Sequence, residues 1–137
     1  AVARHAARHM TDEHLGELER ILQRQRALLD NSEIREFAEA DIDFHRYLVE
    51  CMGNNFLGLL AEGFAGWLIT PLYASLQVRK QSERSYRAHV GVYEALKKRD
   101  PDLAEKAMRA HLDEMRGIYQ VDVMVDGKAA ESEAQQS

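Results

Sequence analysis

The stretch that determines the fold is residues 34–52, IREFAEADIDFHRYLVECM. Residues at steps of three and four lie on one face of a single helix, and most of those residues are apolar here. The face consists of Ile34, Phe37, Ala38, Asp41, His45, Leu48 and Met52. Asp41 and His45 are polar and still fall on this buried face. A buried carboxylate is costly unless it is paired or binds a metal, and a histidine one turn away is a suitable second ligand.

Length and composition indicate one all-α domain. The chain has 137 residues, only two prolines and long amphipathic periods, which favour helices packed around a single core. The only cysteine, Cys51, excludes a disulfide framework within the chain, and we expect it to be a small buried thiol. The net charge of −5 argues against nucleic-acid binding by this chain alone.

The sequence also predicts a cytoplasmic protein. No apolar run looks long enough to cross a bilayer, and no signal peptide opens the chain. We therefore expect no membrane partner. The first residue is alanine, so we expect a piece of a longer protein whose first helix, ending near residue 9, lacks its beginning.

Helical periods and caps predict an antiparallel bundle of about six helices. After the first helix, the expected ranges are residues 11–29, 34–52, 55–78, 85–98 and 101–119. Thr11, Asn54 and Asp100 are the expected N-caps, and Pro71 is expected to kink the fourth helix. Residues 79–84 are charged and are expected to form a link. We expect one domain over residues 1–120 and a disordered tail over 121–137, because the tail has little apolar surface to bury.

Two further histidines are expected to meet the first polar pair. His89 falls on the apolar stripe of the fifth predicted helix, and His111 falls on that of the sixth. Each is equally far from Asp100 at the turn, since 100 − 89 and 111 − 100 both equal 11. In an antiparallel helical hairpin this symmetry places both rings at the same level.

The candidate set is therefore Asp41, His45, His89 and His111, with a metal site in the interior of the bundle. Three neutral imidazoles and one carboxylate suit Zn²⁺, Ni²⁺, Mn²⁺ or Fe²⁺, with positions left for water or a ligand if the ion takes six. The alternative is that these side chains are hydrogen-bonded core residues.

Several short motifs carry a resemblance to a known family. They are residues 41–45 (DIDFH) with 51–54 (CMGN), 87–89 (RAH) with 108–112 (MRAHL), and 5–11 (HAARHMT). These motifs resemble the FCD domain, the C-terminal effector-binding and dimerisation domain of the FadR subfamily of GntR transcription regulators. Ala88 departs from the family, which usually has glutamate before this histidine.

The resemblance implies that Asp41, His45, His89 and His111 bind a divalent metal, which a small carboxylic acid often ligates. It also implies a homodimer whose DNA binding belongs to an N-terminal winged helix-turn-helix that this chain does not contain. On this hypothesis, the acid changes how the helices pack and so changes the spacing of two attached DNA-binding domains.

Ser85, Trp67 and Tyr93 are candidate effector contacts, with ordinary core or capping roles as the alternative. An exposed apolar strip on the fourth helix is the first candidate for a dimer interface. Two other functions stay open at this point, a structural dimerisation module without metal and a metal-dependent hydrolase. The hydrolase is disfavoured because no spare inward carboxylate is available as a general base. We therefore expect no enzymatic activity.

Overall fold

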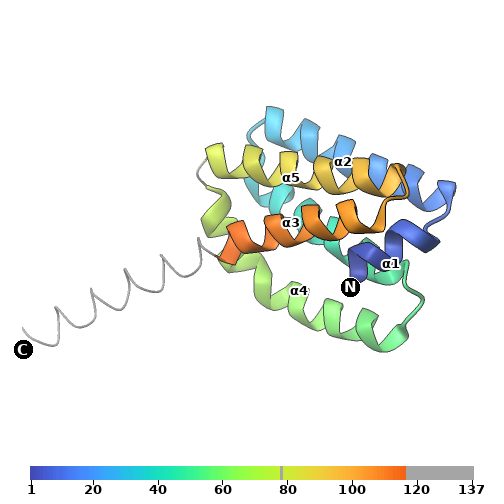
Figure 1. The fold of residues 1–137 in the computed structure, drawn as a ribbon. Coiled ribbons are helices and arrows are strands. Elements are labelled where there is room, and N and C mark those ends of the chain that lie inside the picture. The colour runs from blue at the N-terminus through green and yellow to red at the C-terminus, as the bar shows by residue number, and fades with distance from the viewer. Residues whose placement is uncertain (78, 117–137) are drawn as a thin grey trace, which may run out of the picture.

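The computed structural model describes residues 1–77 and 79–116, and this part of the chain contains six α-helices and no strand. Five are α1 (Val2–His9), α2 (Asp12–Asp30), α3 (Ile34–Glu50), α4 (Asn55–Leu76) and α5 (Arg79–Lys97), and the sixth covers residues 101–116. They form a bundle in which α4 lies along one side (Figure 1). The predicted all-α fold is confirmed, whereas the tail predicted over residues 121–137 lies outside the described residues.

The predicted N-caps hold the helix starts in place. The Thr11 side chain accepts a hydrogen bond from the His14 backbone N–H at 3.1 Å, and His14 Nδ1 accepts one from the Thr11 backbone N–H at 3.2 Å. Asn54 Oδ1 accepts from the backbone N–H of Leu57 at 3.2 Å, and Asp100 Oδ1 caps the sixth helix in the same way. These side chains satisfy N–H groups that the helices leave without partners.

The charged segment at residues 79–84 is helical, so its assignment as a link was wrong. α5 begins at Arg79 rather than at residue 85. Ser82 is fully buried and its hydroxyl donates to the carbonyl oxygen of Leu76 at 2.6 Å, while Lys80 and Arg84 are exposed. Lys80 and Arg84 therefore lie on the outer face of an amphipathic turn. α4 continues through Pro71, and the predicted kink there stays a prediction.

Two groups of buried side chains hold the bundle together. The larger lies between α1, α2, α3, α5 and the sixth helix, and includes Leu18, Phe44 and Leu96. The smaller contains Leu72 and Leu76, which pack the C-terminal end of α4 beside buried residues of α2 and α3. Full burial of one such side chain stabilises the fold by about 1.5–3 kcal/mol. The rest of α4 is much less covered.

α4 meets the length and composition criteria of a membrane span, contrary to the expectation that no segment would. Its 22 residues include an 18-residue window with mean hydropathy 1.3, and only 6% of that window is buried. One such helix is weak evidence for a span, because a helix that packs on a partner chain has the same composition. Phe56, Leu59 and Trp67 are 68%, 69% and 71% exposed, respectively.

Candidate metal centre

Three histidines from three different helices meet at one point inside the bundle. His45 comes from α3, His89 from α5 and His111 from the sixth helix. Their Nε2 atoms form a triangle, 3.2 Å from His89 to His45, 3.1 Å from His89 to His111 and 3.3 Å from His111 to His45. The predicted level placement of His89 and His111 across their hairpin is confirmed by this contact.

The triangle has the size that a single metal ion requires. Nitrogen ligands about 2.0–2.1 Å from one ion lie about 2.8–3.4 Å apart for bond angles between 90° and tetrahedral. Asp41 lies next to this triangle, with its Oδ1 3.6 Å from Nε2 of both His45 and His89. The three histidines therefore form a group that could hold a metal ion, with a carboxylate beside them.

Ser85 controls the orientation of Asp41. Its hydroxyl donates a hydrogen bond to Oδ2 of Asp41 at 2.7 Å, and both side chains are buried. This contact engages Oδ2, while Oδ1 lies 3.6 Å from Nε2 of both His45 and His89. Ser85, predicted as an effector contact, is thus placed as the hydrogen-bond partner of Asp41 and does not line the cavity described below.

A buried glutamine orients the side chain of His89 in a similar way. Gln25 is fully buried on α2, and its side-chain amide donates to the backbone carbonyl of Ala40 at 3.0 Å. That bond turns its Oε1 towards His89, which lies 3.0 Å away at Nδ1. Since Oε1 can only accept, Nδ1 carries the proton and Nε2 keeps a free lone pair facing the other histidines. The ring of Phe44 stacks on His89 with centroids 4.2 Å apart and fixes its plane.

Sequence reasoning missed Gln25, although a signal was present. The buried positions of α2 include Leu18, Leu22, Gln25 and Leu29, which follow steps of four, three and four. A polar residue on that stripe is the same kind of anomaly that identified Asp41 on α3.

The environment keeps the three imidazoles neutral, as metal ligation requires. Burial, reinforced by His89, lowers the pKa of His45 to about 3. Burial is also the main cause of the pKa of His89 lying well below its usual range, and it lowers the pKa of His111. For Asp41 burial raises the pKa, opposed by nearby His45 and by the hydrogen bond from Ser85. A metal cation would favour the ionised carboxylate.

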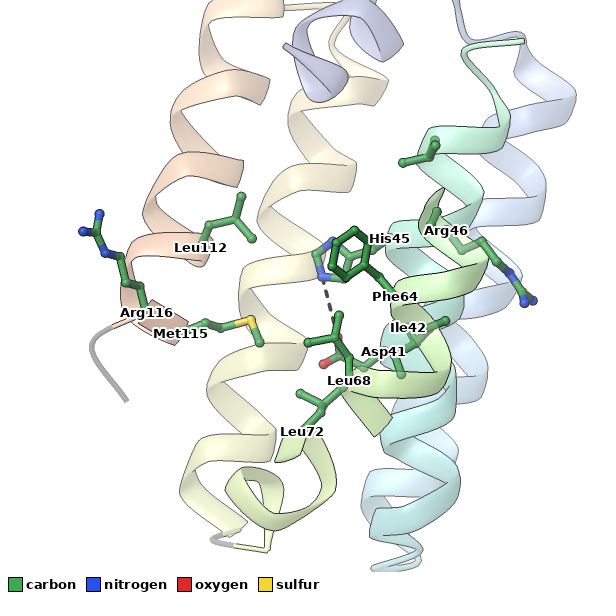
Figure 2. Close-up of a pocket in the computed structure, with 13 residues that line it drawn as sticks. Asp41, Ile42, His45, Arg46, Phe64, Leu68, Leu72, Leu112, Met115 and Arg116 are labelled. Carbon is green, nitrogen blue, oxygen red and sulfur yellow. Dashed lines mark ion pairs between the residues drawn. The ribbon is translucent and has the colours of Figure 1, made fainter. Parts of the chain in front are cut away.

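A cavity of about 910 Å³ opens beside this centre, between α3, α4 and the sixth helix. Asp41 and His45 lie on its wall, and Figure 2 shows their side chains directed to one another across a short gap. Leu68 and Leu72 of α4 and Met115 of the sixth helix also line it. The candidate metal centre and the cavity are therefore adjacent, and Asp41 and His45 face both.

The other predicted contact residues lie elsewhere. Trp67 is 71% exposed and Tyr93 is buried in the larger core group, and neither lines the cavity. Their predicted role as effector contacts stays a prediction, and this cavity does not support it. α4 is apolar on most sides, so its sequence does not reveal that Leu68 rather than Trp67 faces the bundle. Cys51 is partly exposed rather than fully buried.

The fold and the site together define an all-α domain with a buried cluster able to hold a metal beside a ligand-sized cavity. Residues 1–114 match the model of the FCD domain, and the chain belongs to this family. The resemblance seen in its short motifs is thereby confirmed.

Two similar proteins carry the name HTH-type transcriptional repressor NanR. The protein of Escherichia coli (strain K12) is 32% identical over 121 residues, and that of Cronobacter sakazakii is 32% identical over 123 residues. The matches cover 87% and 88% of this chain but only 45% and 46% of those proteins. The chain thus spans about half the length of the curated relatives it matches.

Proposed function

We propose that this chain is the effector-sensing and dimerisation domain of a cytoplasmic, bacterial transcription regulator of the GntR/FadR type. Asp41, His45, His89 and His111 bind a divalent metal, which is Zn²⁺, Ni²⁺, Mn²⁺ or Fe²⁺, and a small organic acid binds beside it. DNA is bound by a winged helix-turn-helix elsewhere in the full protein, as the names of the relatives suggest for those proteins.

One observation carries the proposal. Three Nε2 atoms lie 3.1–3.3 Å from one another, and all three imidazoles have pKa values lowered by burial. The Nε2 atom of a neutral imidazole either donates or accepts, so the three mutual contacts cannot all be hydrogen bonds at the same time. A shared metal satisfies all three at once.

The groups around the site have different roles in binding the acid. A bound divalent metal supplies positive charge that an acid's carboxylate can ligate. Gln25 holds His89 in the tautomer that presents Nε2, and Ser85 holds Asp41 with Oδ1 towards the histidines. His45 and Asp41 face the cavity, so an acid in the cavity reaches the centre from their side.

Effector binding is coupled to the arrangement of helices through the cavity walls. The centre joins α3, α5 and the sixth helix, whereas the cavity adds α4. An acid that contacts both favours one position of α4 over others, and only such differential binding shifts a conformational equilibrium. The exposed apolar side of α4 is the proposed homodimer interface, so a change at α4 alters the spacing of the two attached DNA-binding domains.

A purely structural dimerisation module is the second candidate, favoured by the exposed Phe56, Leu59 and Trp67 on α4. That function would need neither metal nor acid. A hydrolase is less well supported, because Asp41 is the only carboxylate that lines the cavity among the described residues and the matching relatives are regulators. We therefore propose no enzymatic activity.

Metal content separates these functions. We expect near-stoichiometric metal in the purified natural chain by elemental mass spectrometry, and loss of that metal in His89→Ala. His9→Ala, which changes an exposed histidine outside the centre, is the control and should retain the metal. A natural chain that neither carries nor takes up metal would leave the structural module as the better account. Turnover of an ester or amide that a chelator abolishes would support the hydrolase.

A further inference from the structure

We infer that the effector is a carboxylic acid with an apolar body, an aliphatic or aromatic acid rather than a polyhydroxylated one. This inference rests on the proposed function and narrows it to a class of ligand. It comes from the chemistry of the cavity walls beyond the metal centre.

The walls are almost entirely apolar. Besides Asp41 and His45, nine of the thirteen lining residues are apolar and the remaining two are arginines. The largest apolar members are Ile42, Phe64, Leu68, Leu72, Leu112 and Met115. They come from α3, α4 and the sixth helix, so they surround the centre from three sides.

The two arginines do not add a polar subsite. Figure 2 shows the guanidinium groups of Arg46 and Arg116 pointing away from the cavity. Arg46 is engaged by Asp43 at 2.8 Å and by Glu50 at 3.6 Å. What Arg46 offers the cavity is the hydrocarbon part of its side chain, as is common for long charged residues. The polar groups that face a ligand are therefore gathered at the metal centre.

This distribution fixes which acids fit. A carboxylate at the metal end has partners, but hydroxyl groups along the body of a ligand would lose water and find apolar side chains instead. An alkyl chain binds more tightly with each added carbon, because one buried methylene increases the affinity about threefold to fourfold. The cavity volume of about 910 Å³ leaves room for an acid of more than six carbons.

Three simple acids test the inference by isothermal titration calorimetry on the purified chain, loaded in parallel with Ni²⁺ and with Zn²⁺. Hexanoate and gluconate share six carbons and one carboxylate, but gluconate carries hydroxyls on its body. Octanoate extends hexanoate by two methylenes. We expect octanoate to bind about tenfold more tightly than hexanoate, and gluconate to bind at least tenfold more weakly than hexanoate, each saturating at one acid per chain.

The possible results distinguish a failure of the apolar-body inference from a failure of the proposed function. Gluconate binding as tightly as hexanoate would overturn the apolar-body inference and leave the proposed function standing. Equal binding of hexanoate to metal-loaded chain and to His89→Ala would overturn the role of the metal centre. If no acid binds either metal-loaded form, the proposed effector function itself fails.

A pair of leucine variants locates the binding. Leu68→Gln places an amide on the cavity wall, whereas Leu103→Gln places the same group on an exposed side chain of the sixth helix, outside the lining. We expect Leu68→Gln to weaken octanoate binding at least tenfold while its metal content is unchanged, and Leu103→Gln to bind like the natural chain. Equal octanoate affinity in both variants would place the acid elsewhere and overturn the inference.

Discussion

Oε1 of Gln25 lies 3.0 Å from Nδ1 of His89, and this contact determines which nitrogen of His89 faces the other two histidines. The glutamine is itself fixed, because its amide nitrogen donates to the carbonyl oxygen of Ala40. This series of hydrogen bonds links the backbone of α3, through the Gln25 side chain of α2, to the His89 ring on α5. Outer partners of this kind orient a metal-ligating histidine and raise its basicity.

Replacing Gln25 with leucine should weaken metal binding about tenfold to a hundredfold, the usual effect of losing such a partner. Leucine is similar in size, so the cavity left behind is small, but Nδ1 of His89 loses its acceptor. Competition with a chromogenic chelator measures the affinity. Gln23→Leu, at an exposed position of the same helix, is the matched control and should bind metal normally. Natural affinity in Gln25→Leu would show that this contact does not position the ring.

Ser85→Ala tests the second orienting contact. Asp41 then keeps its burial but loses the hydroxyl that donates to Oδ2 at 2.7 Å. We expect a loss of about 1–3 kcal/mol in the free energy of unfolding, measured by urea titration, together with weaker metal binding.

Ser82→Ala on the same helix provides the comparison. Ser82 is equally buried but donates to the backbone oxygen of Leu76, away from the centre. It should lose stability while keeping its metal affinity. If the two variants lose metal affinity to the same extent, the effect of Ser85 is general destabilisation rather than orientation of Asp41.

Much of this centre follows from sequence, and the reasons for the exceptions are physical. Periodicity places Asp41 and His45 on one face of α3, and equal spacing from the turn brings His89 and His111 level. Periodicity fails for α4, because a helix that is apolar on most sides does not reveal which side meets the bundle. It also fails for residues 79–84, where charges on the outer face of a helix look like a link.

The orienting contacts lie beyond sequence patterns for a different reason. Gln25 and Ala40 are fifteen residues apart, and Gln25 and His89 are sixty-four apart. No local period relates such positions, so only packing of α2 between α3 and α5 brings them together. The polar residue on an apolar stripe is visible in the sequence, but its partners are not.

The metal-free domain should lose stability as the pH falls below neutrality. In the unfolded chain each imidazole takes up a proton near pH 6.5, whereas burial lowers the folded pKa of His45 to about 3 and lowers those of His89 and His111. The unfolded state therefore binds more protons below pH 6.5, and stability is full above that value and falls below it. Each histidine contributes up to about 1.4 kcal/mol per pH unit.

Asp41 has the opposite effect on stability as the pH falls, because burial raises its pKa and the folded state takes up this proton before the unfolded state does. Three histidines outweigh one carboxyl, so the free energy of unfolding still decreases as the pH falls. Urea unfolding of the chelator-treated chain at pH 7.5 and 5.5 measures this change. His111→Asn should flatten the pH dependence, and His9→Asn, at an exposed position, should not. A metal-free chain that is as stable at pH 5.5 as at 7.5 would contradict the neutral buried cluster.

Trp67 provides a built-in reporter for the proposed dimer. It is the only tryptophan in the chain and is 71% exposed on the apolar side of α4. If this side is the interface, association buries the indole ring, so its fluorescence emission should shift to shorter wavelength as the protein concentration rises. Leu59→Asp should abolish that shift and give a monomer in analytical ultracentrifugation, because a buried unpaired charge is costly. Leu103→Asp, at an exposed leucine of the sixth helix, should leave the dimer intact. A dimer that survives Leu59→Asp with unchanged emission would place the interface on another face.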